Sequence, residues 1–258
     1  MRSLKRAAII VVAGVLVVVA AVGSALALAF GGLEPSPDGD PLPGGVRLLR
    51  GGFSNLYLLP AGDGVALVDC GDDASGASIR AELARRGLSE EAVKAIFLTH
   101  GHRDHLGACH LFPKARVYAL AKEQPLIEGA VVARGPVSRW RAPATDLATH
   151  VSDPLFDGDS VRVGDLEARV FHLPGHTSGS AAFLVRGVLF LGDSAAVERG
   201  GGHLRPAAWI FSDDQDEAIA SLARLARRVL PDASSILAIA CGHSGPALSA
   251  SPLLERAR

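Results

Sequence analysis

The sequence predicts an α+β fold in which two packed β-sheets lie between outer helices. Short apolar runs bounded by glycine-containing turns fall in two batches, one before residue 120 and one after residue 160. A segment with helical periodicity accompanies each batch, and helices of this kind pack on the outer face of a sheet. The content of 48% hydrophobic and 21% charged residues excludes a largely disordered chain.

Residues 1–30 are predicted to be a membrane anchor or a signal segment. Residues 7–30 carry no charged side chain, and as a helix these 24 residues would span about 36 Å, enough to cross a membrane. Three basic residues precede this run: Arg2, Lys5 and Arg6. This order predicts membrane attachment through the N-terminal helix and an extracytoplasmic domain, in the periplasm or at the cell exterior. The alternative is a cleaved signal peptide and a secreted protein, and Ala-Leu-Ala at 25–27 would suit the cleavage rule for such a peptide. The run is longer than the apolar part of most signal peptides, which favours the uncleaved anchor.

The rest of the chain divides into a linker, one domain and a tail. Residues 31–45 hold four prolines and five glycines, which exclude a helix or a central strand and predict a linker. Residues 46–246 are long enough for one domain with a full core, and residues 247–258 are predicted to be a C-terminal tail. The formal net charge of −1, from 26 Lys and Arg against 27 Asp and Glu, argues against nucleic acid as a partner.

The first batch combines five strands with one helix and ends in an irregular segment. The predicted strands are residues 46–49, 55–59, 65–69, 95–99 and 117–119. Residues 75–86 have helical periodicity through Ile79 and Leu83, and Gly87 follows as a stop signal. Residues 125–155 have weak periodicity and many Pro, Gly and Arg residues, which predicts a loop or an irregular helical lid.

The second batch begins with two predicted hairpins. The paired strands are 161–163 with 167–172, about Gly164-Asp165, and 181–185 with 188–191, about Arg186-Gly187. Residues 213–230 form the clearest predicted helix, because acidic residues stand in its first turn, Arg227 and Arg228 in its last turn, and Pro231 after its end. Residues 235–240 are the last predicted strand.

The chain has three cysteines: Cys70, Cys109 and Cys241. So few cysteines exclude a scaffold held together by disulfides, and an odd number leaves at least one unpaired thiol. Each lies in or beside an apolar run, so we interpret all three as small buried apolar residues. The alternative, a metal ligand, is less favoured because a full ligand set exists without them.

A dense cluster of polar side chains follows the strand 95–99. Four candidate ligands lie within six residues: His100, His102, Asp104 and His105. His100 and His102 are two residues apart, so on an extended or tightly turned backbone both can point the same way. Asp104 and His105 stand where a helical stretch begins and can face a second point close by. Imidazole and carboxylate groups are the ligands of Zn²⁺ and related ions, so the cluster predicts a metal site.

Three more candidate ligands follow later strands, each beside a glycine: His176, Asp193 and His243. Glycine allows the backbone to turn tightly toward a site. Together with the cluster they make seven ligands. Seven ligands with one bridging carboxylate suit two metal ions about 3.5–4 Å apart.

With these motifs the sequence resembles the metallo-β-lactamase-fold metallohydrolase superfamily, in its glyoxalase II-like or lactonase-like branch. The resemblance covers about residues 46–246. The H-x-H-x-D-H core of the superfamily matches residues 100–105, its later elements match His176, Asp193 and His243, and its early aspartate matches Asp69. The resemblance implies a four-layer αβ/βα sandwich of two mixed β-sheets flanked by helices, with the site at one edge.

The resemblance also implies a role for each ligand around two Zn²⁺ ions per chain. His100, His102 and His176 would bind the first ion, Asp104, His105 and His243 would bind the second, and Asp193 would bridge them. Asp69 would orient the ligand loop without touching metal. Asp104 would in addition act catalytically, by holding a metal-bridging hydroxide and passing its proton onward.

The function expected from this resemblance is zinc-dependent hydrolysis of an ester, thioester or lactone. A β-lactamase is an alternative that suits the exported location, but lactamases of the superfamily generally carry Cys or Ser at the position of Asp193. A mononuclear iron enzyme that oxidises sulfur, like a persulfide dioxygenase, is another, although the second ligand set argues against it. A non-catalytic module would be expected to have lost ligands. A strict glyoxalase II is not expected, because that branch usually carries a further helical domain after the position of Pro246.

The substrate is expected to be a small molecule bound by residues 125–155 and 197–212. These segments hold three aromatic and five basic residues: Trp140, Trp209, Phe211, Arg134, Arg139, Arg141, Arg199 and Arg205. Aromatic rings beside arginines could bind an anionic substrate, an acyl group that carries a carboxylate. The competing interpretation is that the arginines are solvated loop residues.

Overall fold

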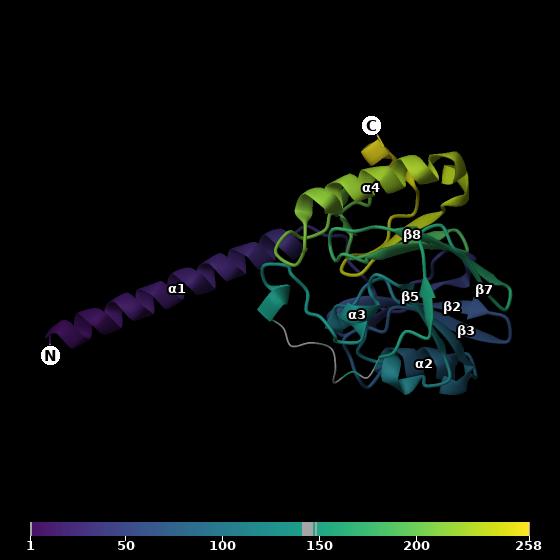
Figure 1. Ribbon diagram of the computed structural model, residues 1–258, viewed down its shortest axis with the longest axis horizontal. Helices are drawn as coiled ribbons and strands as arrows, with labels where there is room; N and C mark the ends of the chain where they lie inside the picture. Colours follow the sequence, from purple (N-terminus) through teal and green to yellow (C-terminus); the bar gives the residue numbers. More distant parts are fainter. Residues whose placement is uncertain (1, 141–146, 148, 258) are drawn as a thin grey trace. The chain divides into compact units, whose positions relative to one another are not determined.

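The computed structural model describes residues 2–140, 147 and 149–257, with the side chains described from residue 12 onward. The chain forms two compact units, Met1–Gly32 and Leu33–Arg258. The first unit is a single helix, α1 (Arg2–Phe30), shown in purple in Figure 1. Its stretch Val12–Phe30 has a mean hydropathy of 2.5 and is long and apolar enough to cross a membrane. The crossing itself stays a prediction.

The first sheet of the second unit has six strands in the order in which they occur in the chain. They are β1 (Arg47–Gly51), β2 (Ser54–Ala61), β3 (Gly64–Val68), β4 (Val93–Phe97), β5 (Arg116–Leu120) and β6 (Asp153–Leu155). The pairs β1–β2 and β2–β3 are antiparallel, and the pairs from β3 to β6 are parallel. The carboxyl ends of β3, β4 and β5 therefore lie at one edge of the sheet.

The second sheet has five strands in the order β13-β10-β9-β8-β7. They are β7 (Ser160–Val163), β8 (Leu166–His172), β9 (Ala181–Val185), β10 (Val188–Gly192) and β13 (Ala238–Cys241). Both predicted hairpins are confirmed, because β7 pairs with β8 and β9 pairs with β10 in antiparallel register. The last strand is parallel to β10, so their carboxyl ends point the same way.

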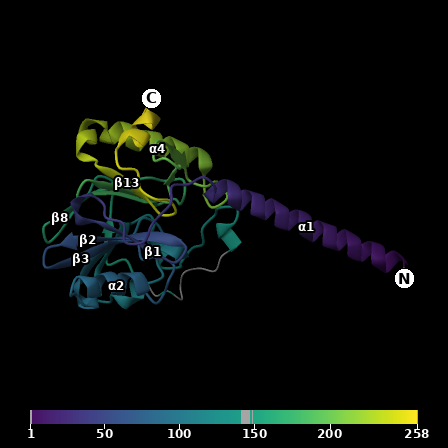
Figure 2. The ribbon, with the colours of Figure 1, turned by 180° about the vertical axis from the view of Figure 1, so that it is seen from behind.

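The two sheets pack face to face, and a helix covers the outer side of each (Figures 1 and 2). Aromatic rings from both sheets meet between them: Phe97 lies 5.4 Å from Phe183, and Tyr57 lies 5.1 Å from Phe190, by ring centroids. On the first sheet α2 (Ala77–Arg85) buries Ile79 and Leu83. On the second sheet α4 (Gln215–Val229) buries an apolar stripe that includes Leu222 and Leu225. The predicted α+β architecture of two mixed sheets flanked by helices is confirmed.

Two short strands form a small sheet that the sequence did not reveal. They are β11 (Ala195–Val197) and β12 (Leu204–Pro206), which pair antiparallel. A run of three residues is too short to show a period of two, which is why the pattern of apolar residues missed them. The same reason explains why β6 was missed, at the end of residues 125–155, which were expected to be a loop or a lid. The rest of that segment is mostly irregular apart from α3 (Gln124–Ile127) at its start, and residues 141–146 and 148 lie outside the described residues.

The segments expected as linker and tail both pack against the domain. Leu33 forms a β-bridge with Glu198, and the Glu34 backbone N–H donates to the Val197 carbonyl at 2.9 Å. In the tail, Leu253 of α5 (Ser251–Leu254) is fully buried. High proline and glycine content excludes regular structure, but it does not exclude packing of single apolar side chains.

Two of the three cysteines form a disulfide, Cys70–Cys109, and the buried Cys241 is free. The expected burial of all three is confirmed, and so is the unpaired thiol. The interpretation of Cys70 and Cys109 as simple apolar residues was wrong. The two lie 39 positions apart in the sequence and meet because the turn after β3 hydrogen-bonds to the ligand segment, from the Cys70 N–H to the His105 carbonyl at 2.8 Å. Local sequence patterns do not predict a contact between residues so far apart in the chain.

Candidate metal centre

The segment after β4 carries four of the candidate ligands and is fixed by Asp69. Asp69 follows β3, the parallel neighbour of β4, and has a left-handed backbone with φ of 59°. Its carboxylate accepts hydrogen bonds at 2.8 Å from both the backbone N–H and the hydroxyl of Thr99. The same carboxylate lies 2.8 Å from Nδ1 of His105. This contact orients the ring of His105, so that its Nε2 faces the other ligands. Burial disfavours the charged form of His105, but the charges of Asp193 and Asp69 outweigh it and raise its pKa well above the usual value.

The second sheet supplies the other three ligands from separate connections. His176 lies between β8 and β9, after Gly175, whose φ is +128°. A Cβ at Gly175 would collide with the backbone of Ala218 in the first turn of α4, so glycine is required there. Asp193 follows β10 and His243 follows β13, and the parallel pairing of these strands brings both side chains to one place.

The structure brings all seven predicted ligands together in two groups that share Asp193. In each group the ligand atoms all lie within 4.8 Å of one another. The first group is His100, His102, His176 and Asp193, and the second is Asp104, His105, Asp193 and His243. A Cβ at Gly242 would collide with the Asp193 carboxylate, so this glycine leaves room for the group that both clusters use.

The imidazoles of the first group point their nitrogens at one another, and burial keeps those of His100 and His176 neutral. Nε2 of His176 lies 2.9 Å from Nδ1 of His102 and 3.2 Å from Nε2 of His100. Burial, with the neighbouring imidazoles, lowers the pKa of His176 to about 3 and holds the pKa of His100 well below its usual value. Their lone pairs are therefore available to a cation at neutral pH.

The second group pairs imidazoles with ionised carboxylates. Nε2 of His243 lies 3.0 Å from Asp193 and 3.2 Å from Asp104. Burial disfavours the charged form of His243, but the charge of Asp193 and the hydrogen bond with Asp104 outweigh it and raise its pKa to about 9. Burial likewise opposes ionisation of Asp104 and Asp193, yet the contacts with His243 and His105 lower the pKa of both carboxyl groups.

The donor set fits a metal pair. Nε2 of His105 and Oδ1 of Asp193 are buried, lie 3.3 Å apart and make no well-aligned hydrogen bond with any described residue. Buried polar atoms without partners are costly, and a cation between the two groups would satisfy them. Imidazole nitrogens and carboxylate oxygens in groups of four suit Zn²⁺ and related first-row ions.

Comparison with known proteins gives the family. Residues 49–233 match the family model described as the metallo-beta-lactamase superfamily. The chain belongs to this superfamily. The match includes six of the seven candidate ligands, and His243 lies beyond its end.

Curated relatives in the metallo-β-lactamase superfamily are hydrolases. Hydroxyacylglutathione hydrolases of Aeromonas hydrophila and Alkalilimnicola ehrlichii are 33% and 32% identical over 165 and 197 residues, which are 62% and 74% of this chain. The chain covers 52% and 62% of their own lengths. An acyl-coenzyme A thioesterase of Bos taurus, MBLAC2, is 28% identical over 164 residues, covering 55% of this chain and 58% of the relative. These relatives support an enzyme of the hydrolase class.

Solved structures of the superfamily share the fold. A metallo-β-lactamase family protein from Thermus thermophilus is 28% identical with a TM-score of 0.56, over 87% of this chain and 77% of the other. The B3 metallo-β-lactamase BLEG-1 is 26% identical with a TM-score of 0.59, over 81% of this chain and 96% of the other.

Most of the arginines expected to bind substrate have partners within the described part of this superfamily member. Trp140 and Trp209 are 84% and 56% exposed. Their loops are joined by a hydrogen bond from the Val137 N–H to the Ile210 carbonyl at 2.9 Å. Arg134 pairs with Asp213, and Arg205 pairs with Glu198. Arg139 donates hydrogen bonds to backbone carbonyls. Arg199 is exposed, and Arg141 lies outside the described residues. An exposed residue that sequence reasoning missed, Phe53, has its ring 4.8 Å from that of His243.

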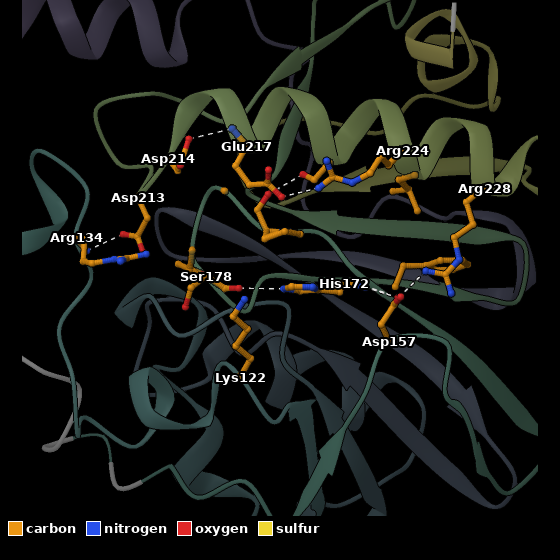
Figure 3. A pocket seen from close by; sticks show the side chains of 16 residues that line it. Lys122, Arg134, Asp157, His172, Ser178, Asp213, Asp214, Glu217, Arg224 and Arg228 are labelled. Carbon is orange, nitrogen blue, oxygen red and sulfur yellow. Dashed lines mark hydrogen bonds and ion pairs between the residues drawn. The ribbon is translucent and has the colours of Figure 1, made fainter.

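A cavity of about 580 Å³ lies beneath α4, and its lining includes His172, Ser178 and Glu217 (Figure 3). In the described part of the chain its lining includes none of the seven candidate ligands. Six of its charged residues form three pairs: Arg224 with Glu217, Arg228 with Asp157 and Arg134 with Asp213. The cavity adjoins the segment that carries His176, because Gly175 and Thr177 both line it.

Proposed function

We propose that the protein is a dinuclear zinc hydrolase of thioester, ester or lactone bonds. The observation that carries this proposal is the pair of ligand groups joined by Asp193. A carboxylate between two groups suits two ions held a few ångströms apart. The hydroxyacylglutathione hydrolases and the acyl-coenzyme A thioesterase among the relatives favour a thioester.

Each ligand has a role in this proposal. His100, His102 and His176 would hold the first ion, and Asp104, His105 and His243 the second, with Asp193 between them. Asp69 would hold His105 through Nδ1 so that Nε2 points toward the second ion.

When bound, the zinc pair would supply hydroxide at neutral pH and polarise the carbonyl of the substrate. Asp104 would do the proton transfer at this site. Its backbone carbonyl accepts a hydrogen bond from the buried Ser54 hydroxyl, which fixes its position, and its lowered pKa keeps the carboxylate ionised and able to accept a hydrogen bond. Phe53 beside His243 and the exposed Trp140 and Trp209 would contact the acyl group.

β-Lactam hydrolysis is the second candidate, because the B3 metallo-β-lactamase BLEG-1 shares the fold and is 26% identical to this chain. Asp193 argues against it. A carboxylate between the ions suits a leaving thiolate or alkoxide that the second ion stabilises. An iron enzyme is a third possibility that the donor set alone does not separate from a zinc enzyme.

Metal analysis and a substrate panel test the proposal on one preparation. We expect two zinc ions per chain, and thioester or lactone hydrolysis at least about tenfold above β-lactam hydrolysis in kcat/KM, a difference of about 1.4 kcal/mol. One ion or none in a folded, metal-replete sample would contradict the dinuclear site. A β-lactam turned over faster than every ester, thioester and lactone would contradict the substrate class.

We also propose that α1 anchors the protein and that the domain lies outside the cytoplasm. The basic residues before an apolar helix support this topology. The Cys70–Cys109 disulfide supports it independently, since disulfides persist in oxidising compartments. A reporter fused after Arg258 should be active only outside the cytoplasm, and activity confined to the cytoplasm would refute the topology.

A further inference from the structure

A buried carboxylate outside the ligand set connects the two segments that form the first ligand group. Glu123 precedes α3 and is 1% exposed. Its Oε1 accepts a hydrogen bond from the Gly101 N–H, and its Oε2 accepts one from the Gly179 N–H, both at 2.8 Å. The sequence did not predict these contacts, because Glu123 lies between the polar residues Lys122 and Gln124 and belongs to no recognised motif.

The two amides belong to the segments that carry the first group of ligands. Gly101 lies between His100 and His102, and Gly179 lies three residues after His176. These segments follow strands of different sheets, β4 and β8. The Glu123 carboxylate therefore joins the ligands of one sheet to the ligand of the other.

The close packing around the carboxylate is specific. A Cβ at Gly179 would lie 2.5 Å from the Glu123 backbone nitrogen and 2.6 Å from its Oε2. A Cβ at Gly101 would lie 2.8 Å from the backbone nitrogen of Ile127 in α3. Only glycines at these two positions let the segments approach Glu123 closely enough for both hydrogen bonds.

The segments have one further backbone link near the strands. The Ala181 N–H donates to the Thr99 carbonyl at 2.8 Å. That bond holds the segments where they leave the sheets, whereas Glu123 holds them beyond His100 and His176, where the backbone is irregular. The two connections act at different points along the segments.

We propose that Glu123 is a positioning residue that sets the separation of His100 and His102 from His176, and so the affinity and geometry of the first metal site. This inference rests on the proposed metal-dependent function. A carboxylate suits the task because both of its oxygens accept hydrogen bonds. A glutamine would offer one acceptor and turn its NH₂ group toward the second backbone N–H, and an aspartate is too short to reach both amides.

Cobalt and zinc titrations of the full chain test the proposal. We expect Glu123→Gln to remain folded by circular dichroism but to bind its first Zn²⁺ about tenfold more weakly in chelator competition, as is usual when a group that orients a ligand is lost. The visible absorption of bound Co²⁺ should also change, because it reports the ligand geometry. Glu123→Asp should fall between Glu123→Gln and the wild type.

Glu128→Gln is the matched control. Glu128 lies five residues further on, contacts His150 and Gln124, and accepts from the Val151 N–H, away from the ligand segments. It should bind both ions as the wild type does. The proposal is wrong if folded Glu123→Gln keeps wild-type affinity and Co²⁺ absorption, or if both Glu123 variants fail to fold. A wild type that binds no metal would instead refute the proposed function.

Discussion

The two sheets contribute to the candidate metal centre in different ways. The first sheet supplies four ligands within one segment of six residues, from His100 to His105. The second sheet supplies His176, Asp193 and His243 from three separate connections. The first contribution depends on a local turn held by Asp69, and the second depends on strand pairing across the sheet. Motif spacing therefore reports the first half of the centre directly, whereas the second half becomes a site only in the folded sheet.

The largest expected effect comes from the ligand that both groups share. Asp193→Ala should lower kcat by about a hundredfold or more, equivalent to about 2.7 kcal/mol of transition-state stabilisation, because the bridging carboxylate holds the two ions at their working separation. The fold should persist, since Asp193 lies after the end of β10. Steady-state kinetics, metal analysis and circular dichroism check this. Asp165→Asn, in the exposed turn between β7 and β8, is the control. Turnover near the wild-type level with two ions bound would show that Asp193 is not the bridge.

The outer helices of the two sheets differ as well, since among the described residues α2 carries a buried charge cluster and α4 does not. The Glu82 carboxylate of α2 is buried and hydrogen-bonded at 2.7 Å by Arg85 and Arg86. The hydrogen bond from Arg85 is the main cause of the lowered pKa of Glu82, about 2 against its usual 4.5. On α4 the pair Glu217–Arg224 is exposed.

Glu82→Gln should lower the free energy of unfolding by about 1–3 kcal/mol at pH 7. A depressed pKa stabilises the fold fully above the unfolded value near 4.5, so the difference from the wild type should shrink as the pH falls from about 5 toward 2. Glu217→Gln should change stability by less than about 0.5 kcal/mol. Denaturant unfolding as a function of pH measures both. Equal losses for the two variants would contradict the distinction between the helices.

The smallest expected effect concerns helix caps. Asp214 accepts a hydrogen bond from the Glu217 N–H at 3.0 Å and caps α4, whereas Gly76 before α2 has no side chain to do so. Asp214→Ala should cost about 1 kcal/mol of stability, and Gly76→Ala should act through its left-handed backbone instead. Thermal unfolding of Asp214→Ala and Asp214→Asn tests the cap, because asparagine keeps the accepting oxygen. Similar destabilisation by alanine and asparagine would mean that the cap contributes little.

Much of the fold followed from local patterns. The periodicity of the segments that became α2 and α4 placed both helices within two residues of their observed ends, because apolar residues three and four apart face one side of a helix. Both hairpins were located by Gly164 and Gly187, which adopt positive φ in the turns. The strands too short to show a period, β6, β11 and β12, were missed.

The sequence by itself determined the ligand types, the family resemblance and the order of the main strands and helices, because each depends on residues that are close together or on motifs in a fixed order. Tertiary structure decided which distant residues meet. It joined Cys70 to Cys109, placed Glu123 between Gly101 and Gly179, and packed Leu33 and Leu253 onto the domain. The physical reason is that these contacts depend on how the sheets and connecting segments pack, and residue spacing along the chain carries no record of that packing.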